Sequence, residues 1–336
     1  MESPVDLVYC WCDDADAVWR EKRDRFAAER GYVMSGHESG ACRYRSNDDL
    51  RFSLRSVGLY APFVRRVFVV VDDDAASPPW LDASSGRVRV VRHGEIMPRD
   101  ALPSFNSVAI EHFLHRIPGL SERFLYANDD MMFNRRLDER FFYASDGLPV
   151  CRYAGRYDTY AKRGLPVPSY NQMLRNSDEI VRRDFGLAGD FARAYGMHPH
   201  HNVDAYLKSD IEACAEHFGA EAFGESHPPF RTGRELLRFV YSAYALAAGR
   251  AHFRLARFRV GTKRPWYKRL LRPAYADSLV FPAAKWRTAE ALLAKYRPGL
   301  FCFNDSADAT PADLEWLAGF YRRRFPSPSP FERAGS

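Results

Sequence analysis

The chain has 336 residues, of which 46% are apolar by type and 14% are aromatic. This aromatic content excludes an intrinsically disordered protein and indicates one or two domains with a buried core. The net charge of +6 is spread along the whole sequence and gives no indication of a nucleic-acid partner. The opening residues lack a signal-peptide pattern, and no apolar run approaches the ~20 residues of a membrane span. We therefore expect a cytoplasmic protein.

Apolar runs and amphipathic stretches alternate along the first half of the chain. The apolar runs predict strands over residues 5–11, 67–71, 88–91 and 124–127. Helices are expected between them, the second capped by Asn47 and the third opening at Ser104 and Asn106. Strands that alternate with helices predict an α/β fold, with a mostly parallel sheet covered on both faces.

Acidic side chains follow three of these predicted strands. They are Asp13, Asp14 and Asp16 after the first strand, Asp72 to Asp74 after the second, and Asp129 and Asp130 with Asn128 after the fourth. A single cluster of this kind is typical of a solvated turn. In α/β sheets, however, ligands bind beyond the carboxyl ends of the strands, so three clusters at equivalent positions favour a metal or phosphate site.

The second half of the chain is less regular. We expect a loop over 164–168, a short helix over 178–185, mainly helical structure over 205–258, a strand over 300–305, a helix over 312–324 and then a mobile tail rich in Pro and Ser. We therefore divide the chain into an α/β half (1–150), a mainly helical insertion (151–299), and a C-terminal strand and helix that return to the core (300–336).

The segment 263–275 mixes basic and aromatic residues. Such a mixture suits a peripheral contact with the anionic surface of the inner membrane, at the cytoplasmic face. An ordinary basic surface loop explains it equally well, and both interpretations stay open.

Six cysteines are present, and Cys10 and Cys12 are close in sequence. No second close pair completes a structural zinc site. We therefore interpret the cysteines as free thiols in a reducing compartment.

Four groups of residues together resemble one known family. They lie at 6–16, at 43–73 with 102–133, at 199–206 with 228–231, and at 300–305 with 320–332. In this order they resemble the Stealth family of hexose-1-phosphate transferases. That family includes bacterial capsular polysaccharide phosphotransferases and is similar to the catalytic part of lysosomal-enzyme N-acetylglucosamine-1-phosphotransferase.

The resemblance implies a Rossmann-like, glycosyltransferase-A-like fold and a UDP-sugar donor. It implies transfer of a hexose 1-phosphate, in the first instance N-acetylhexosamine 1-phosphate, to a glycan or lipid-linked oligosaccharide hydroxyl. The product would be a phosphodiester in a capsule or cell-wall glycopolymer, with UMP as the leaving group. Mg²⁺, or Mn²⁺ in its place, is the expected cofactor. The oligomeric state is not indicated.

Residues for this chemistry are expected in the strand-end and family motifs. Asp130 and then Asp129 suit a magnesium site, because Mg²⁺ prefers hard oxygen ligands. Asp305 either completes that site or caps a turn. His200 is expected to act as the base, with His198 as the alternate, although a histidine-based zinc site is a second interpretation.

Arg231, which matches the family's arginine, would hold the diphosphate. Further residues are expected to contact the substrates: Trp11, Asp13, Asp16, Asn47, Arg51, Asn106, Ser107, Glu111 and His198. Two other functions remain open. One is a glycosyltransferase that releases UDP on the same scaffold, and the other is a non-catalytic glycan-binding protein.

Overall fold

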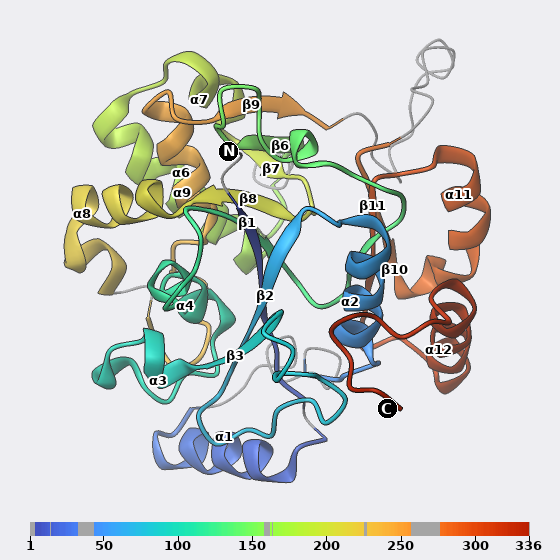
Figure 1. Ribbon diagram of the computed structural model, residues 1–336. Coiled ribbons are helices and arrows are strands. Elements are labelled where there is room, and N and C mark those ends of the chain that lie inside the picture. Colours follow the sequence, from blue (N-terminus) through green and yellow to red (C-terminus); the bar gives the residue numbers. More distant parts are fainter. Residues whose placement is uncertain are drawn as a thin grey trace.

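The computed structural model describes residues 4–13, 15–32, 44–157, 162, 164–224, 227–256 and 276–335. Its main sheet has the strand order β3-β2-β1-β4-β8 (Figure 1). The strands are β1 (Val5–Cys10), β2 (Val64–Val71), β3 (Val88–Arg92), β4 (Arg123–Ala127) and β8 (Asp204–Leu207). The first four are parallel and β8 is antiparallel to β4. The expected α/β fold with a mostly parallel sheet is therefore confirmed.

Both faces of this sheet are buried, as the alternation of side chains in β1 shows. Leu7 and Tyr9 pack with apolar residues of α2 (Asp49–Tyr60), on one face. Val8, which points to the other face, packs with residues of α4 (Ser107–Glu111) and of the later helices. A parallel sheet covered in this way places the carboxyl ends of its strands along one edge.

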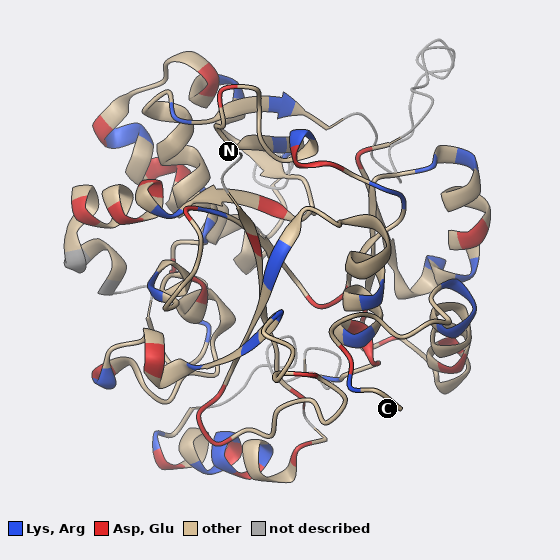
Figure 2. Ribbon diagram, in the orientation of Figure 1, with Lys and Arg blue, Asp and Glu red and all other residues tan. Residues whose placement is uncertain are grey.

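Further helices surround the two faces, and Figure 1 shows α6 to α9 on one side of the main sheet and α2, α11 and α12 on the other. Their bounds are α1 (Ala17–Glu29), α3 (His93–Ile96), α6 (Ser169–Phe185), α7 (Gly189–Ala194), α8 (Lys208–Gly224), α9 (Phe239–Ala247), α11 (Ala289–Tyr296) and α12 (Pro311–Arg324). Figure 2 shows that α1 and α12 each carry residues of both charge signs. None of the helices in these described ranges combines the length and apolar character that a membrane span requires.

Two smaller sheets complete the structure. One has the order β10-β11-β5, with β10 (Ser278–Pro282), β11 (Leu300–Asn304) and β5 (Met131–Phe133). The other has the order β7-β6-β9, with β7 (Met197–Pro199), β6 (Val150–Arg156) and β9 (His252–Leu255). Because β5 directly follows Asp130 and pairs with β11, the first of these sheets brings the C-terminal segment to the end of β4. The three-part division of the chain stays a prediction.

Several expected elements differ in detail. Asp48, with a left-handed backbone (φ 60°), is the N-cap of α2, so the assignment of the cap to Asn47 was wrong. The side chain of Asn47 instead donates to Asp305, at 3.4 Å. The region 205–258 is not wholly helical, because it contains β9 and most of β8. Four-residue strands are too short to show a period of two against helical neighbours.

The C-terminal tail is packed, so the expectation of a mobile tail was wrong. Phe331 is 1% exposed, and the carboxylate of Glu332 accepts hydrogen bonds from Arg51 at 2.7 Å and Arg55 at 2.8 Å. The amide of Ser329 donates to the same carboxylate at 2.8 Å. The basic-aromatic segment 263–275 lies outside the described residues.

This carboxylate gives a pH-dependent contribution to stability. Burial raises the pKa of Glu332, but the hydrogen bonds from Arg55, Ser329 and Arg51 outweigh it and lower the pKa to about 2. A pKa below the unfolded value stabilises the folded state above pH ~4.4, by up to about 3 kcal/mol, and this contribution is lost as the pH falls toward 2. About half should be lost by pH 3.

We therefore expect Glu332→Gln to lower the free energy of unfolding by up to about 3 kcal/mol at pH 7, and by about half as much at pH 3. Urea unfolding at both pH values measures the difference from the wild type. Glu290→Gln is the control, because Glu290 pairs with Arg323 on the surface. The Glu290 side chain is 59% exposed and the Arg323 side chain is 62% exposed. A difference between wild type and Glu332→Gln that does not change with pH would contradict this account.

Candidate active site

A cavity of about 1020 Å³ opens where the carboxyl ends of β1 and β4 meet the end of β11. Many of the residues singled out from the sequence line it: Trp11, Ser107, Glu111, Asp129, Asp130, His198, His200, Arg231 and Asp305. Asp129 and Asp130 reach it because they follow a parallel strand, and Asp305 because it follows β11. The pairing of β5 with β11 thus joins two acidic motifs that are far apart in the sequence.

Carboxylates crowd one side of the cavity. Burial, together with the neighbouring charge of Asp130, raises the pKa of Asp129 to about 7. The pKa of Asp130 is also raised to about 7, because burial and repulsion from Asp49 outweigh the hydrogen bond from Cys302, which lowers it. The pKa of Asp49 itself, in the first turn of α2, is raised to about 7 by burial and by Asp129. Such repulsion between buried carboxylates is relieved by a bound cation.

The donor atoms of this acidic cluster fit a hard divalent ion. Within the described residues, Oδ1 of Asp130 is buried and has no hydrogen-bond partner. Asp129 and Asp305 offer further carboxylate oxygens to the same cavity. Mg²⁺ takes oxygen ligands and needs only one or two protein carboxylates, since water and substrate phosphates complete its shell.

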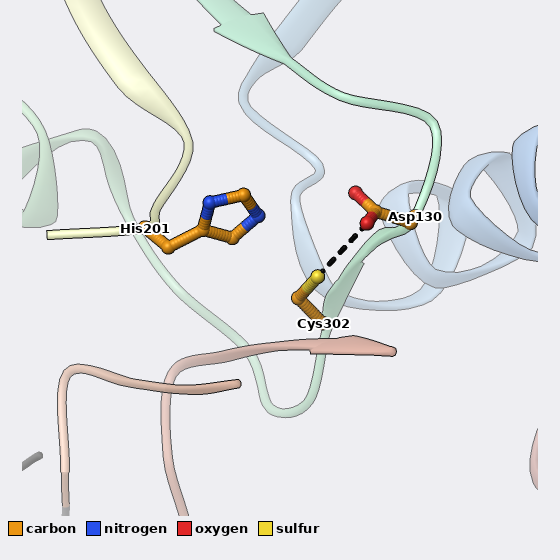
Figure 3. Close-up of side chains that lie close together, drawn as sticks. All are labelled: Asp130, His201 and Cys302. Atoms are coloured by element: carbon orange, nitrogen blue, oxygen red, sulfur yellow. Dashed lines mark hydrogen bonds between the residues drawn. The ribbon is translucent and has the colours of Figure 1, made fainter. Parts of the chain in front are cut away.

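One side of Asp130 faces a histidine and a cysteine. Ligand atoms of Asp130, His201 and Cys302 lie within 4.8 Å of one another, and Figure 3 shows the three side chains converging from three different elements. Sγ of Cys302 donates to Oδ2 of Asp130 at 3.0 Å. Burial lowers the pKa of His201 to about 4, with added repulsion from Arg238 and His200, so this imidazole is neutral at pH 7.

A largely buried arginine, Arg238, organises another part of the cavity wall. Arg238 donates to Glu111 at 3.0 Å and to Asp204 at 2.8 Å, and it lies 4.6 Å from the ring centre of Tyr126. The hydroxyl of Tyr126 donates to Glu111 at 3.1 Å. The two carboxylates neutralise the arginine, so this network shapes the cavity wall rather than leaving a net positive charge.

Arg231 is held at the start of α4. Its guanidinium donates to the hydroxyl of Ser107, and its carbonyl accepts from the hydroxyl of Tyr32 at 2.7 Å. The rings of Phe105 and Phe230 stack with centres 5.3 Å apart, which fixes the preceding segment against the same helix. Arg231 is thereby presented to the cavity from a rigid support.

The histidines that precede β8 differ in their surroundings. His200 is 7% exposed, and its backbone N–H donates to the carbonyl of Arg152 at 2.8 Å. His198 stacks parallel to Tyr170, with ring centres 6.5 Å apart. His198, His200 and His201 all line the cavity, so the structure brings the whole motif to the site.

Other residues expected to contact substrate do not line the cavity. Asp16 is the N-cap of α1, and its side chain accepts from the amides of Val18 at 2.9 Å and Ala76 at 2.8 Å. Asp13 accepts from the amide of Ala15 at 3.0 Å. Both carboxylates therefore hold the turn after β1, and their contact with substrate stays a prediction.

Three more of these residues also support the site from outside its lining. Asn106 is the N-cap of α4, accepts from the amide of Val108 at 3.1 Å and donates to the carbonyl of Pro228 at 3.0 Å. Arg51 pairs with the C-terminal tail and Asn47 with Asp305. Their expected contact with substrate likewise stays a prediction.

Several residues at the site were not predicted from the sequence. Four of them line the cavity: Asp49, His201, Asp204 and Arg238. A fifth, Cys302, contacts Asp130 beside the cavity. Asp49 carried only the signal of an acidic first helical turn, and Arg238 none that separates it from the many other arginines. Asp204 opens β8, whose other three residues fall in the region predicted to be mainly helical.

Two family models match the chain. Residues 43–151 match the model described as Stealth protein CR2, conserved region 2. Residues 291–336 match the model described as Stealth protein CR4, conserved region 4. The first match includes Asp129 and Asp130, and the second includes Cys302 and Asp305.

Curated relatives extend the similarity over nearly the whole chain. An exopolysaccharide phosphotransferase of Streptomyces coelicolor is 34% identical, over 98% of this chain and 52% of the relative. The exopolysaccharide phosphotransferase CpsY of Mycobacterium tuberculosis is 32% identical, over 98% of this chain and 58% of the relative. The capsular polysaccharide phosphotransferase SacB of Neisseria meningitidis serogroup A is 29% identical, over 98% of this chain and 57% of the relative. The chain thus spans about half the length of these relatives.

Among solved structures, a galactosyltransferase LgtC bound to donor and acceptor sugar analogs is similar over 96% of each chain, with 11% identity and a TM-score of 0.41. The fold assignment rests on the strand order of the main sheet.

Proposed function

The chain belongs to the Stealth protein family, and from this premise we propose that it is a sugar-1-phosphate transferase. It would move a hexose 1-phosphate, in the first instance N-acetylhexosamine 1-phosphate, from a UDP-sugar to a glycan hydroxyl. The observation that carries the proposal is one cavity that gathers Asp129, Asp130, Asp305, His200 and Arg231. The names of these relatives, all polysaccharide phosphotransferases, support the same class of reaction.

Phosphoryl transfer requires positioned reactants, neutralised phosphate oxygens and a base for the attacking hydroxyl. Asp129, Asp130 and Asp305 would hold Mg²⁺ or Mn²⁺, which when bound supplies positive charge beside the diphosphate. Arg231 would bind the non-bridging oxygens, because a guanidinium offers two parallel donors to a phosphate. The support from Ser107 and Tyr32 would keep that fork in place.

His200 would take the proton of the acceptor hydroxyl as the hydroxyl oxygen attacks the β-phosphorus of the donor. The new bond joins that oxygen to the β-phosphorus, and the bond that breaks is the one from the β-phosphorus to the oxygen that leaves with UMP. The leaving oxygen carries the electron pair. Trp11 and Glu111, which line the cavity, would contact the donor.

The acceptor and its location form a second part of the proposal. A lipid-linked oligosaccharide at the cytoplasmic face of the inner membrane would suit a glycopolymer transferase. The basic-aromatic segment 263–275 would then contact the membrane. Sedimentation with anionic liposomes at low salt would detect this contact. If the protein does not bind the liposomes, the proposal of membrane contact is wrong.

The decisive experiment identifies the bond that breaks. Incubation with UDP-N-acetylhexosamine, Mg²⁺ and a glycan acceptor should release UMP and place one new phosphorus in the product for each sugar transferred. Nucleotide chromatography and phosphorus NMR measure the two quantities, with an acceptor-free reaction as control. Release of UDP with a phosphorus-free glycoside would instead establish a glycosyltransferase, and saturable binding of glycan without turnover would indicate a binding protein.

A further inference from the structure

We propose that Asp130, His201 and Cys302 form a binding site for a thiophilic divalent ion of the zinc class, which competes with the hard cation for Asp130. Carboxylate, imidazole and thiol atoms lie within 4.8 Å of one another here. Figure 3 shows the three residues together: Asp130 follows β4, His201 precedes β8, and Cys302 lies in β11. Three separate parts of the chain thus supply the three ligand types that zinc takes in proteins.

The spacing suits a tetrahedral ion. Zinc binds sulfur at ~2.3 Å and nitrogen or oxygen at ~2.0–2.2 Å, so its ligand atoms lie roughly 3.5 Å apart. Sγ of Cys302 and Oδ2 of Asp130 are already 3.0 Å apart. Movements of about 1 Å by the histidine would therefore close the trio around an ion. Three protein ligands leave the fourth position for water or an anion.

Two orphaned atoms at the trio point independently to a ligand. Nε2 of His201 is buried and accepts or donates no hydrogen bond in the described part of the chain, and the same is true of Oδ1 of Asp130. A buried polar atom without a partner destabilises the folded state. An ion bound between these side chains would give both atoms a partner.

Ligand softness decides which ion this trio prefers. Sulfur and imidazole favour zinc and its neighbours over magnesium, whereas the nearby carboxylates favour magnesium. On binding, the S–H bond of Cys302 breaks, a sulfur–metal bond forms and one proton passes to water. The hydrogen bond from Cys302 to Asp130 is lost at the same time. Since Asp130 serves both sites, the two ions exclude each other.

Co²⁺ tests the site without any activity assay, because thiolate bound to Co²⁺ gives a charge-transfer band in the near ultraviolet. The wild-type chain should develop this band with about one equivalent of Co²⁺, and Zn²⁺ should abolish it. Cys302→Ser should lack the band, and His201→Ala should bind Co²⁺ at least about tenfold more weakly. Circular dichroism of each variant checks that it is folded.

Cys214→Ser is the matched control, because Cys214 is likewise a buried free thiol, on α8, and is not part of the trio. Its Co²⁺ spectrum should equal that of the wild type. The proposal is overturned if the wild type shows no charge-transfer band, or if Cys302→Ser keeps it.

The competition can also be measured as inhibition, and this part rests on the proposed function. Zn²⁺ should inhibit transfer by the wild type at saturating Mg²⁺, and a chelator should restore it. Cys302→Ser, compared with its own uninhibited rate, should need at least about tenfold more Zn²⁺. A thiolate band without any turnover would refute the proposed function alone, whereas turnover without the band would refute the zinc site alone.

Discussion

Asp130→Asn is expected to abolish sugar-1-phosphate transfer, lowering turnover by at least about a thousandfold, or ~4 kcal/mol of transition-state stabilisation. Asparagine keeps the shape of the side chain and can still accept the hydrogen bond from Cys302. It removes, however, the negative charge that would hold the cation beside the diphosphate. Steady-state turnover at increasing Mg²⁺ measures the loss, and saturating Mg²⁺ should not restore it.

The same substitution should not weaken the fold. Burial and the neighbouring Asp49 raise the pKa of Asp130, which means that its ionised form opposes folding at neutral pH. Without metal, the melting temperature of Asp130→Asn should therefore equal or exceed that of the wild type. Retention of more than about a tenth of the turnover, or a melting temperature lower by about ten degrees, would make Asp130 a structural residue instead.

Asp178→Asn is the control that shows whether the loss of turnover requires a carboxylate in the cavity or only a buried carboxylate. The pKa of Asp178 is raised to about 6, because burial outweighs the hydrogen bonds from Gly196 and Tyr157, which lower it. Asp178 is 8% exposed but does not line the cavity. We expect this control to change stability modestly and to keep turnover within a few-fold of the wild type, so a comparable loss in both variants would argue against the metal role of Asp130.

The strand-end position made Asp129 and Asp130 predictable. An apolar run followed by carboxylates marks the carboxyl end of a buried strand. Because the main sheet is mostly parallel, these carboxylates then lie at the edge of the sheet where ligands bind. The strands β1 to β4 were predicted from apolar runs that alternate with amphipathic stretches. Local pattern was sufficient for these residues because both the strand and its ending lie within ten consecutive positions.

Residues joined only by long-range pairing could not be predicted in this way. Cys302 meets Asp130 across 172 positions, because β11 pairs with β5. Arg238 owes its role to Glu111 and Asp204, which lie on two other elements. The packed tail has the same origin, since its composition indicates mobility while Glu332 finds two arginines on α2.

His200→Ala is expected to reduce the turnover number by roughly a hundredfold to ten-thousandfold, with little change in the KM for the donor. General-base catalysis acts in the transition state, because the proton leaves the acceptor hydroxyl only as the new bond to phosphorus forms. In the proposed function, donor binding depends instead on the carboxylate cluster and Arg231. The acidic limb of the pH–rate profile, which reports protonation of the base, should disappear in this variant.

The neighbouring histidines make the assignment testable within one motif. His201→Ala should bind thiophilic metal at least about tenfold more weakly but keep the acidic limb, because its ring faces Asp130 and Cys302 and the proposed base is His200. His198→Ala should alter the stacking on Tyr170 and raise the KM more than it lowers turnover. If His201→Ala removes the acidic limb while His200→Ala keeps it, then His201 takes the proton. Because one imidazole cannot take a proton and bind zinc at the same time, His201 would then be unable to complete the zinc site during turnover. Zinc binding would in that case block the catalytic step directly.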